Sequence, residues 1–170
     1  MKVLLRIIVI ATLMAVPVTE SPTHAQAPQG ATGERYMKHA NGSFEPKIAP
    51  AESSLIGKQG GIGRMTIDKL ISGDLAGTTK GEMLTTTTES TGAMAYVALE
   101  TVTGTLDGRS GTFVFMHNAT MTKTDPKSQS LHIIVVPGSG TDGLIGLSGT
   151  FVIHIDAQGK HTYTFDYELP

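Results

Sequence analysis

The 170-residue chain contains no cysteine and no tryptophan, and its aromatic residues are limited to four tyrosines and five phenylalanines. The absence of cysteine excludes disulfides, thiolate metal ligands and thiol nucleophiles. Charged residues are also few, with 13 basic and 15 acidic side chains. The formal net charge of −2 gives no basic surface of the kind that binds nucleic acid. A protein without covalent staples depends on a well-packed core. The sequence predicts no cofactor, no metal and no nucleic-acid partner.

The N-terminus combines two basic residues with an uncharged apolar run at 7–18 and a small-residue segment at 23–27. This order is typical of a secretory signal peptide, and the run is shorter than the roughly 20 residues that span a bilayer. Cleavage after Ala25 is favoured, because cleavage after Ala27 would place Pro28 beside the scissile bond. Retention of the segment as a membrane anchor is the alternative.

We therefore predict a signal peptide at 1–25, a flexible leader rich in Gly, Ala, Pro and Gln at 26–37, and a single domain at 38–170. The compact signal indicates a bacterial protein that is exported to the periplasm or secreted. No membrane insertion is expected after cleavage.

Apolar alternation recurs in short runs across the domain, and no window shows a sustained helical period. The predicted strands lie at about 38–48, 62–71, 74–87, 92–106, 109–122, 130–137, 143–156 and 161–169. Eight sequential strands without a crossover helix predict an all-β, closed antiparallel meander barrel, since closure removes exposed edges. Such a barrel is either filled by side chains or holds one small ligand.

A turn at Asp107-Gly108 separates two alternating strands and fixes their register. Asp-Gly in this position is typical of a two-residue type I′ hairpin, which pairs Leu106 with Arg109. The same register places Glu100 opposite Phe115.

This register also pairs Ala98 with His117, which makes Glu100 and His117 diagonal neighbours on the face that carries Tyr96. A carboxylate and an imidazole among aromatics form the candidate site, with Glu100 and His117 as the candidate catalytic residues. Alternatively, His117 is a core histidine bonded to a neighbour. The predicted ligand-binding residues are Tyr96, Glu100, Phe115, His117 and Tyr163.

The other face of the hairpin is also apolar, since it carries Val97, Leu99, Val114 and Met116. Either face is therefore a candidate for the barrel interior. If the Glu100 face is inside, the outer face is an exposed apolar patch that a homo-oligomer would cover. Packing of a loop over the patch is the alternative.

A second polar group, Arg64, Asp68, Lys80 and Glu82, lies on the second and third predicted strands. A three-residue loop at 72–74 sets Arg64 opposite Glu82. Such cross-strand sets are usually solvated pairs of small energetic value, and we interpret this one so.

Several segments together resemble a known family: GRMTIDK at 63–69, KGEML at 80–84, YVALE at 96–100, VTGTL at 102–106, GRSG at 108–111, His117, LSGT at 147–150 and GKHTY at 159–163. They are similar to the small bacterial proteins called domain of unknown function 3224. The resemblance covers nearly all of the chain after the leader. It implies a closed eight-stranded barrel similar in architecture to allene oxide cyclase and distantly like streptavidin or lipocalins, and it implies no activity.

Three functions are open at this point. The leading hypothesis is an exported barrel that binds a small, partly apolar molecule inside, with Tyr96, Glu100 and His117 orienting its polar end. The second is an isomerase or cyclase that uses Glu100 and His117 as an acid-base pair. The third is a structural or oligomerisation module with a solid core.

Overall fold

The computed structural model describes residues 36–122, 124–125 and 129–170. The predicted signal peptide and residues 26–35 of the predicted leader lie outside the described residues. Among those described, no helix is long and apolar enough to cross a bilayer.

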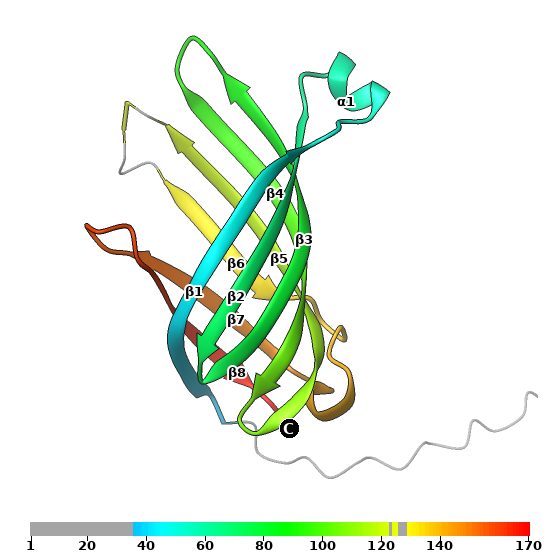
Figure 1. Cartoon of the computed structure of the whole chain (residues 1–170), viewed down its shortest axis with the longest axis vertical. Coiled ribbons are helices and arrows are strands. Elements are labelled where there is room, and N and C mark those ends of the chain that lie inside the picture. Colours follow the sequence, from blue (N-terminus) through cyan, green and yellow to red (C-terminus); the bar gives the residue numbers. More distant parts are fainter. Residues whose placement is uncertain (1–35, 123, 126–128) are drawn as a thin grey trace, which may run out of the picture. The chain divides into compact units, whose positions relative to one another are not determined.

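Eight antiparallel strands close into a barrel in which each strand pairs with the next and β1 pairs with β8 (Figure 1). The strands are β1 (Lys38–Ala51), β2 (Gly63–Gly73), β3 (Leu75–Thr88), β4 (Ala93–Leu106), β5 (Arg109–Thr122), β6 (Ser130–Val135), β7 (Ser148–Ile155) and β8 (His161–Glu168). The predicted meander barrel is confirmed.

The β4–β5 hairpin follows the predicted register over its whole length. Asp107 and Gly108 have φ of 54° and 73°, and positive φ at both central residues is what a type I′ turn requires. Leu106 lies opposite Arg109, and the ladder continues to Ala93 and Thr122. A local turn thus determines the register of the two strands that carry Glu100 and His117.

Two short helices in the described part of the chain depart from the expected pattern. Helix α1 (Leu55–Gln59) follows β1, and its N-cap Ser54 accepts a hydrogen bond from the Gly57 amide at 3.1 Å. The 3-10 helix η2 (Asp142–Leu144) occupies the start of the seventh predicted strand, so the expected strand at 143–156 was wrong at its N-terminal end. Leu144 of this helix is fully buried, so η2 places an apolar side chain in the core where the expected strand would have begun.

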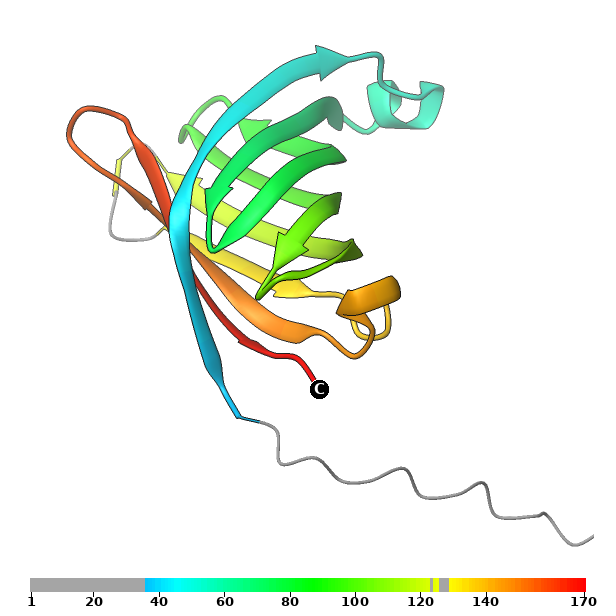
Figure 2. The ribbon, with the colours of Figure 1, turned by 60° about the horizontal axis from the view of Figure 1, so that its bottom comes forward.

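The two ends of the barrel differ in filling. One end contains the β2–β3 and β4–β5 turns, η2 and the C-terminus (Figures 1 and 2). Large apolar side chains pack this end: Leu75, Leu106, Phe113, Phe115, Leu144, Leu147, Phe151, Tyr163, Phe165, Tyr167 and Leu169. A smaller cluster of Ile67, Met83 and Ala98 lies on β2, β3 and β4.

The seam between β6 and β7 is short. Among the described residues its register gives one pair, Ile134 with Thr150, whereas β4 and β5 pair along their full length. The chain after β6 bonds back to β5 instead, through Val136 and the Val114 carbonyl at 2.8 Å. The barrel is therefore least tightly closed between β6 and β7.

Candidate functional site

The Glu100 face of the β4–β5 hairpin points into the barrel. Glu100 is 0% exposed, whereas Val97 and Leu99 on the opposite face of the same strand are 55% and 59% exposed. His117 on β5 is also buried, at 1%. The structure thus selects between the two apolar faces that the sequence left open.

Lys69 is the partner of Glu100. It lies on β2 between the inward residues Ile67 and Ile71, and its Nζ is 2.5 Å from Glu100 Oε2. The two side chains are 4% and 0% exposed. Because an unpaired buried charge is very costly, this ion pair explains how the interior accommodates both groups.

Thr79 on β3 completes the polar contacts of the carboxylate. Its hydroxyl accepts a hydrogen bond from the Lys69 amide at 2.8 Å and donates one to Glu100 Oε1. Residues from the two neighbouring strands β2 and β3 therefore hold both carboxylate oxygens of Glu100 on β4, and the Thr79 hydroxyl links Glu100 to the Lys69 backbone amide.

His117 approaches the same carboxylate from β5. Its Nε2 lies 3.0 Å from Glu100 Oε2, yet it is fully buried and has no aligned hydrogen-bond partner in the structure. Buried polar atoms in this condition are rare in native proteins. His117 Nε2 therefore faces the Glu100 carboxylate without an aligned hydrogen bond to it.

Burial and contact oppose each other in the ionisation of this cluster. Burial disfavours the Glu100 carboxylate, but His117, Lys69 and Thr79 together outweigh it and hold the pKa of Glu100 below its usual value. Burial lowers the pKa of Lys69, and the Glu100 carboxylate offsets part of that effect. Burial also lowers the pKa of His117, although the contact with Glu100 acts in the opposite direction. The lowered pKa favours a neutral imidazole. With His117 neutral, the cluster has no net charge whichever of Lys69 and Glu100 carries the shared proton.

A cavity of about 530 Å³ lies above this cluster, toward the end with the β5–β6 connection and the β7–β8 loop. It is lined by Phe44, Pro46, Ile48, Ile67, Lys69, Met83, Tyr96, His117, Ala119, Thr120, Met121, Gln129, Ser130, Leu131, Ile153, Ile155 and His161. Its walls are mainly apolar. Three of these residues, Ile48, Leu131 and Ile155, are 50%, 41% and 62% exposed and give the cavity an apolar mouth.

The other predicted ligand-binding residues divide between this cavity and the core. Tyr96 is partly buried and lines the cavity, and burial followed by the charge of Glu100 raises the pKa of its hydroxyl. Phe115 lies in the packed end of the barrel, edge-on to Phe113 at 4.9 Å. Tyr163 is also in that core, where its hydroxyl bonds the amide and the carbonyl of Leu75, each at 3.0 Å.

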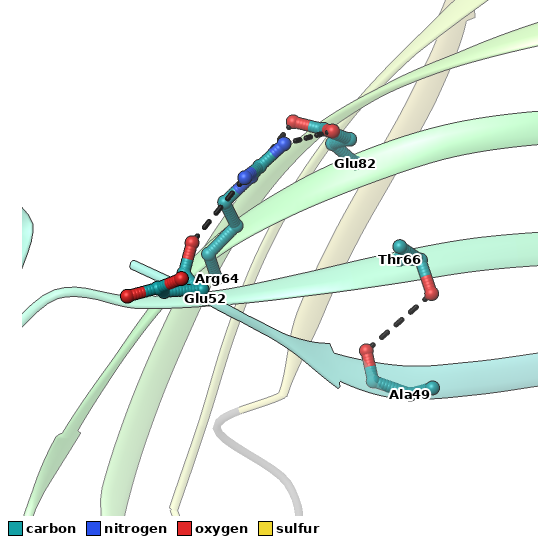
Figure 3. Close-up of polar contacts among 5 residues, drawn as sticks. All are labelled: Ala49, Glu52, Arg64, Thr66 and Glu82. Carbon is teal, nitrogen blue, oxygen red and sulfur yellow. Dashed lines mark hydrogen bonds and ion pairs between the residues drawn. The ribbon is translucent and has the colours of Figure 1, made fainter. Parts of the chain in front are cut away.

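The predicted charge set on β2 and β3 lies outside the barrel, as solvated pairs. Arg64 bonds both oxygens of Glu82 and the Glu52 carbonyl (Figure 3), and Lys80 bonds Asp68 at 2.7 Å. The guanidinium of Arg64 lowers the pKa of Glu82 through this hydrogen bonding.

The expected register of these strands was wrong by two residues. Arg64 lies opposite Leu84, with Glu82 as its diagonal neighbour. Arg64 reaches the diagonal because its side chain is long, so the pair forms in either register. Thr66 on the same strand bonds the Ala49 carbonyl of β1 at 3.5 Å (Figure 3).

Sequence reasoning missed Lys69 and Thr79. The signal for Lys69 was its phase, since it alternates with Ile67 and Ile71 on an otherwise apolar face. Thr79 had no distinctive signal, because threonine is common on both faces of β3.

The arrangement has defined chemical capacities. Glu100 and His117 can exchange a proton, and Lys69 supplies a cation or an amine in a low-dielectric cavity. No group of three or more His, Cys, Asp or Glu residues in the described part of the chain is placed to hold a metal ion.

Fold and site together define a class of protein: a closed eight-stranded antiparallel barrel, packed at one end, with a cavity above a buried Lys-Glu-His cluster at the other. The family model described as "Protein of unknown function (DUF3224)" matches residues 40–167. The chain belongs to this family.

A solved relative supports the same assignment. It is the crystal structure, at 1.84 Å resolution, of a protein with unknown function from the DUF3224 family of Shewanella oneidensis MR-1. The two chains are 39% identical, and the match covers 79% of this chain and 98% of that one, with a TM-score of 0.70. No curated protein matches the sequence.

Proposed function

We propose that this protein binds a small, partly apolar molecule in the open half of its barrel. The observation that carries the proposal is the cavity of about 530 Å³ above the fully buried His117 Nε2, which lacks an aligned hydrogen-bond partner. Small-molecule sites in proteins are commonly about 300–1,000 Å³, mainly apolar, with a few convergent polar groups. A half-filled interior favours this function over a solid structural module.

The charges of the cluster indicate the polar end of the ligand. Glu100 already balances Lys69, so a charged ligand group would enter a low-dielectric site without a counterion. A carbonyl or hydroxyl group can instead bond the His117 imidazole or the Tyr96 hydroxyl, since both residues line the cavity, at little electrostatic cost. We therefore infer a neutral polar group on an apolar body.

The apolar mouth supports entry of such a molecule. Ile48, Leu131 and Ile155 come from β1, β6 and β7, so they lie on both sides of the weakly paired β6–β7 seam. Exposed apolar side chains around a cavity are typical of ligand-binding grooves.

The test is a fluorescence titration of the purified protein with N-phenyl-1-naphthylamine, an uncharged apolar probe, followed by displacement with 1-decanol. We expect saturable binding that decanol reverses. The variant Ala119→Phe should abolish probe binding, because Ala119 lines the cavity and phenylalanine would fill part of it. Asn118→Phe, on the outer face of the same strand, is the matched control. Equal binding by both variants, with folding verified by circular dichroism, would contradict the proposal.

The polar end has its own comparison. His117→Ala should weaken decanol binding by about 3- to 10-fold, which corresponds to the loss of one neutral hydrogen bond. His154→Ala, on the exposed face of β7, should leave it unchanged. Sodium decanoate should bind more weakly than decanol, and tighter binding of the anion would refute the inferred neutral group.

An isomerase or cyclase is a second candidate function. The observation that favours it is the 3.0 Å approach of His117 Nε2 to Glu100 Oε2 beside the cavity, which is within reach for proton transfer. For any substrate found, turnover should depend on pH and should fall in both Glu100→Gln and His117→Ala. Turnover that survives both substitutions would exclude this pair.

A further inference from the structure

We propose that Lys69 forms a Schiff base with an apolar aldehyde that enters the cavity. This inference rests on the proposed function and narrows its ligand class to carbonyl compounds. Three features of the structure carry it: an amine inside an apolar cavity, a carboxylate in contact with that amine, and a histidine on the same carboxylate oxygen.

Lys69 differs from the surface lysines in its surroundings. Its side chain is 4% exposed and lines the cavity, whereas the side chains of Lys58 and Lys80 are 56% and 79% exposed. Its Nζ lies 5.4 Å from the centre of the Phe44 ring. A lysine becomes a nucleophile when desolvation favours its neutral amine, and burial lowers the pKa of Lys69 in this way.

Glu100 supplies the proton transfer that attack requires. The Lys69 ammonium can pass a proton across the 2.5 Å contact to Glu100 Oε2, leaving a neutral amine and a carboxylic acid. The nitrogen lone pair then forms a bond to the aldehyde carbon, and the carbonyl oxygen takes up the proton from Glu100. His117 is positioned to relay protons to this oxygen, because its Nε2 lies 3.0 Å from Oε2.

The carbinolamine that results then loses water. A nitrogen proton and the hydroxyl group leave together as H₂O, with a C=N bond in place of the C–O bond and a protonated imine on Lys69. The balance is one ammonium and one aldehyde converted to one iminium and one water, so no oxidant or reductant is involved. Because the positive charge stays on the Lys69 nitrogen, Glu100 remains paired and no buried charge is left alone.

The test is reductive trapping. The purified protein is incubated with less than one equivalent of decanal and with sodium cyanoborohydride, and the adduct is located by intact mass and peptide mapping. We expect one decyl group, with Lys69 labelled at least about tenfold faster than Lys80 because the cavity concentrates the aldehyde at a desolvated amine. Labelling spread evenly over the exposed lysines would overturn the proposal.

Matched variants and a competitor complete the experiment. Lys69→Arg retains the cation but cannot form an imine, so the single adduct should disappear, while Lys80→Arg should retain it. In the unmodified chain, 1-decanol should protect Lys69 and leave Lys80 labelling unchanged, a result that needs no variant to fold. Displacement of the naphthylamine probe by decanol without labelling of Lys69 would refute the Schiff base alone. Failure of both would refute the proposed function as well.

Discussion

At the scale of single residues, the Glu100 carboxylate organises the interior. It accepts contacts from Lys69 on β2, Thr79 on β3 and His117 on β5. Removing a carboxylate from water costs free energy, and the contacts with these three partners offset that cost. The same compensation leaves His117 Nε2 beside the cavity without an aligned partner.

The Lys69 and Glu100 pair predicts strong non-additivity in stability. Glu100→Gln should destabilise the protein by about 3–5 kcal/mol, because it leaves the Lys69 cation buried and unpaired. Lys69→Met should also destabilise it, and the double variant should cost less than the sum of the two singles. Urea unfolding followed by circular dichroism measures all three. Additive losses would show that the two groups do not act as a pair.

His117 predicts a loss of stability on acidification. The pKa of His117 in the fold is below its ordinary value of 6.5, so around that pH the unfolded chain binds more protons than the folded one. Stability should therefore fall as pH falls through about 6.5, by up to about 1.4 kcal/mol per unit for one proton. The pKa of Glu100 is also lowered, from its ordinary value of 4.5, so protonation of Glu100 adds a further loss of stability below about pH 4.5.

The check is the free energy of unfolding between pH 7.5 and 4.5. His117→Asn should reduce the fall of the unfolding free energy between pH 7.5 and 4.5. His154→Asn, on the exposed face of β7, should leave that fall unchanged. An unchanged fall in His117→Asn would mean that the acid sensitivity arises elsewhere.

At the scale of elements, register determines which side chains meet. The β4–β5 ladder follows from one local turn, but the β2–β3 ladder is shifted by two residues from the register that a three-residue loop at 72–74 would give. A shift by two keeps every side chain on its face, so Ile67 and Lys69 stay inward in either register. The contact of Lys69 with Glu100 also needs the curvature of three adjacent strands.

Tyr163 fastens β8 to the start of β3. Its hydroxyl bonds both the amide and the carbonyl of Leu75, so Tyr163→Phe should cost about 1–3 kcal/mol by leaving buried backbone groups unpaired. Binding of the naphthylamine probe should not change, because Tyr163 lies outside the cavity lining.

Tyr96→Phe is the reciprocal control, since Tyr96 lines the cavity. It should leave stability within about 0.5 kcal/mol and weaken decanol binding. Loss of probe binding in Tyr163→Phe, with the fold intact, would instead support the ligand-binding role that the sequence suggested for Tyr163.

At the scale of the whole molecule, the inward choice of the Glu100 face leaves an apolar outer face. Leu84, Val97, Leu99 and Met116 are 51%, 55%, 59% and 40% exposed on β3, β4 and β5. Isolated exposed apolar residues are ordinary, but a contiguous patch is typical of an interface. The homo-oligomer expected from the sequence therefore stays a prediction.

Light scattering coupled to size exclusion tests it. The unmodified protein should elute as an oligomer and Leu99→Glu as a monomer, because a carboxylate at the centre of an apolar interface would lose its hydration. Val152→Glu, on the outer face of β7, is the matched control and should remain oligomeric. A monomeric unmodified protein would show that the patch stays exposed or binds another partner.

Export is a further prediction at this scale. When the full chain is expressed in a bacterium, we expect processed protein outside the cytoplasm. Its intact mass should be that of a chain whose first residue is Gln26. Ala25→Arg should accumulate the unprocessed form, because the cleavage position requires a small residue. An unmodified chain that keeps residues 1–25 would favour the membrane-anchor alternative.

The sequence by itself determined the number of strands, the antiparallel meander and the β4–β5 register. These features follow from local alternation and from a turn whose backbone geometry few residues adopt. It also placed Glu100 beside His117, because both lie on the hairpin that this turn defines.

Only the tertiary structure decided which face of that hairpin is inside, since both faces are apolar and alternation alone is symmetric. Closure of the barrel resolved that symmetry. It also brought Lys69, 31 residues away along the chain, within 2.5 Å of Glu100, and it left the other half of the interior open. Two buried charges can pair only when they lie close together in space. For Lys69 and Glu100 the fold creates that proximity, and their distance along the sequence does not reveal it.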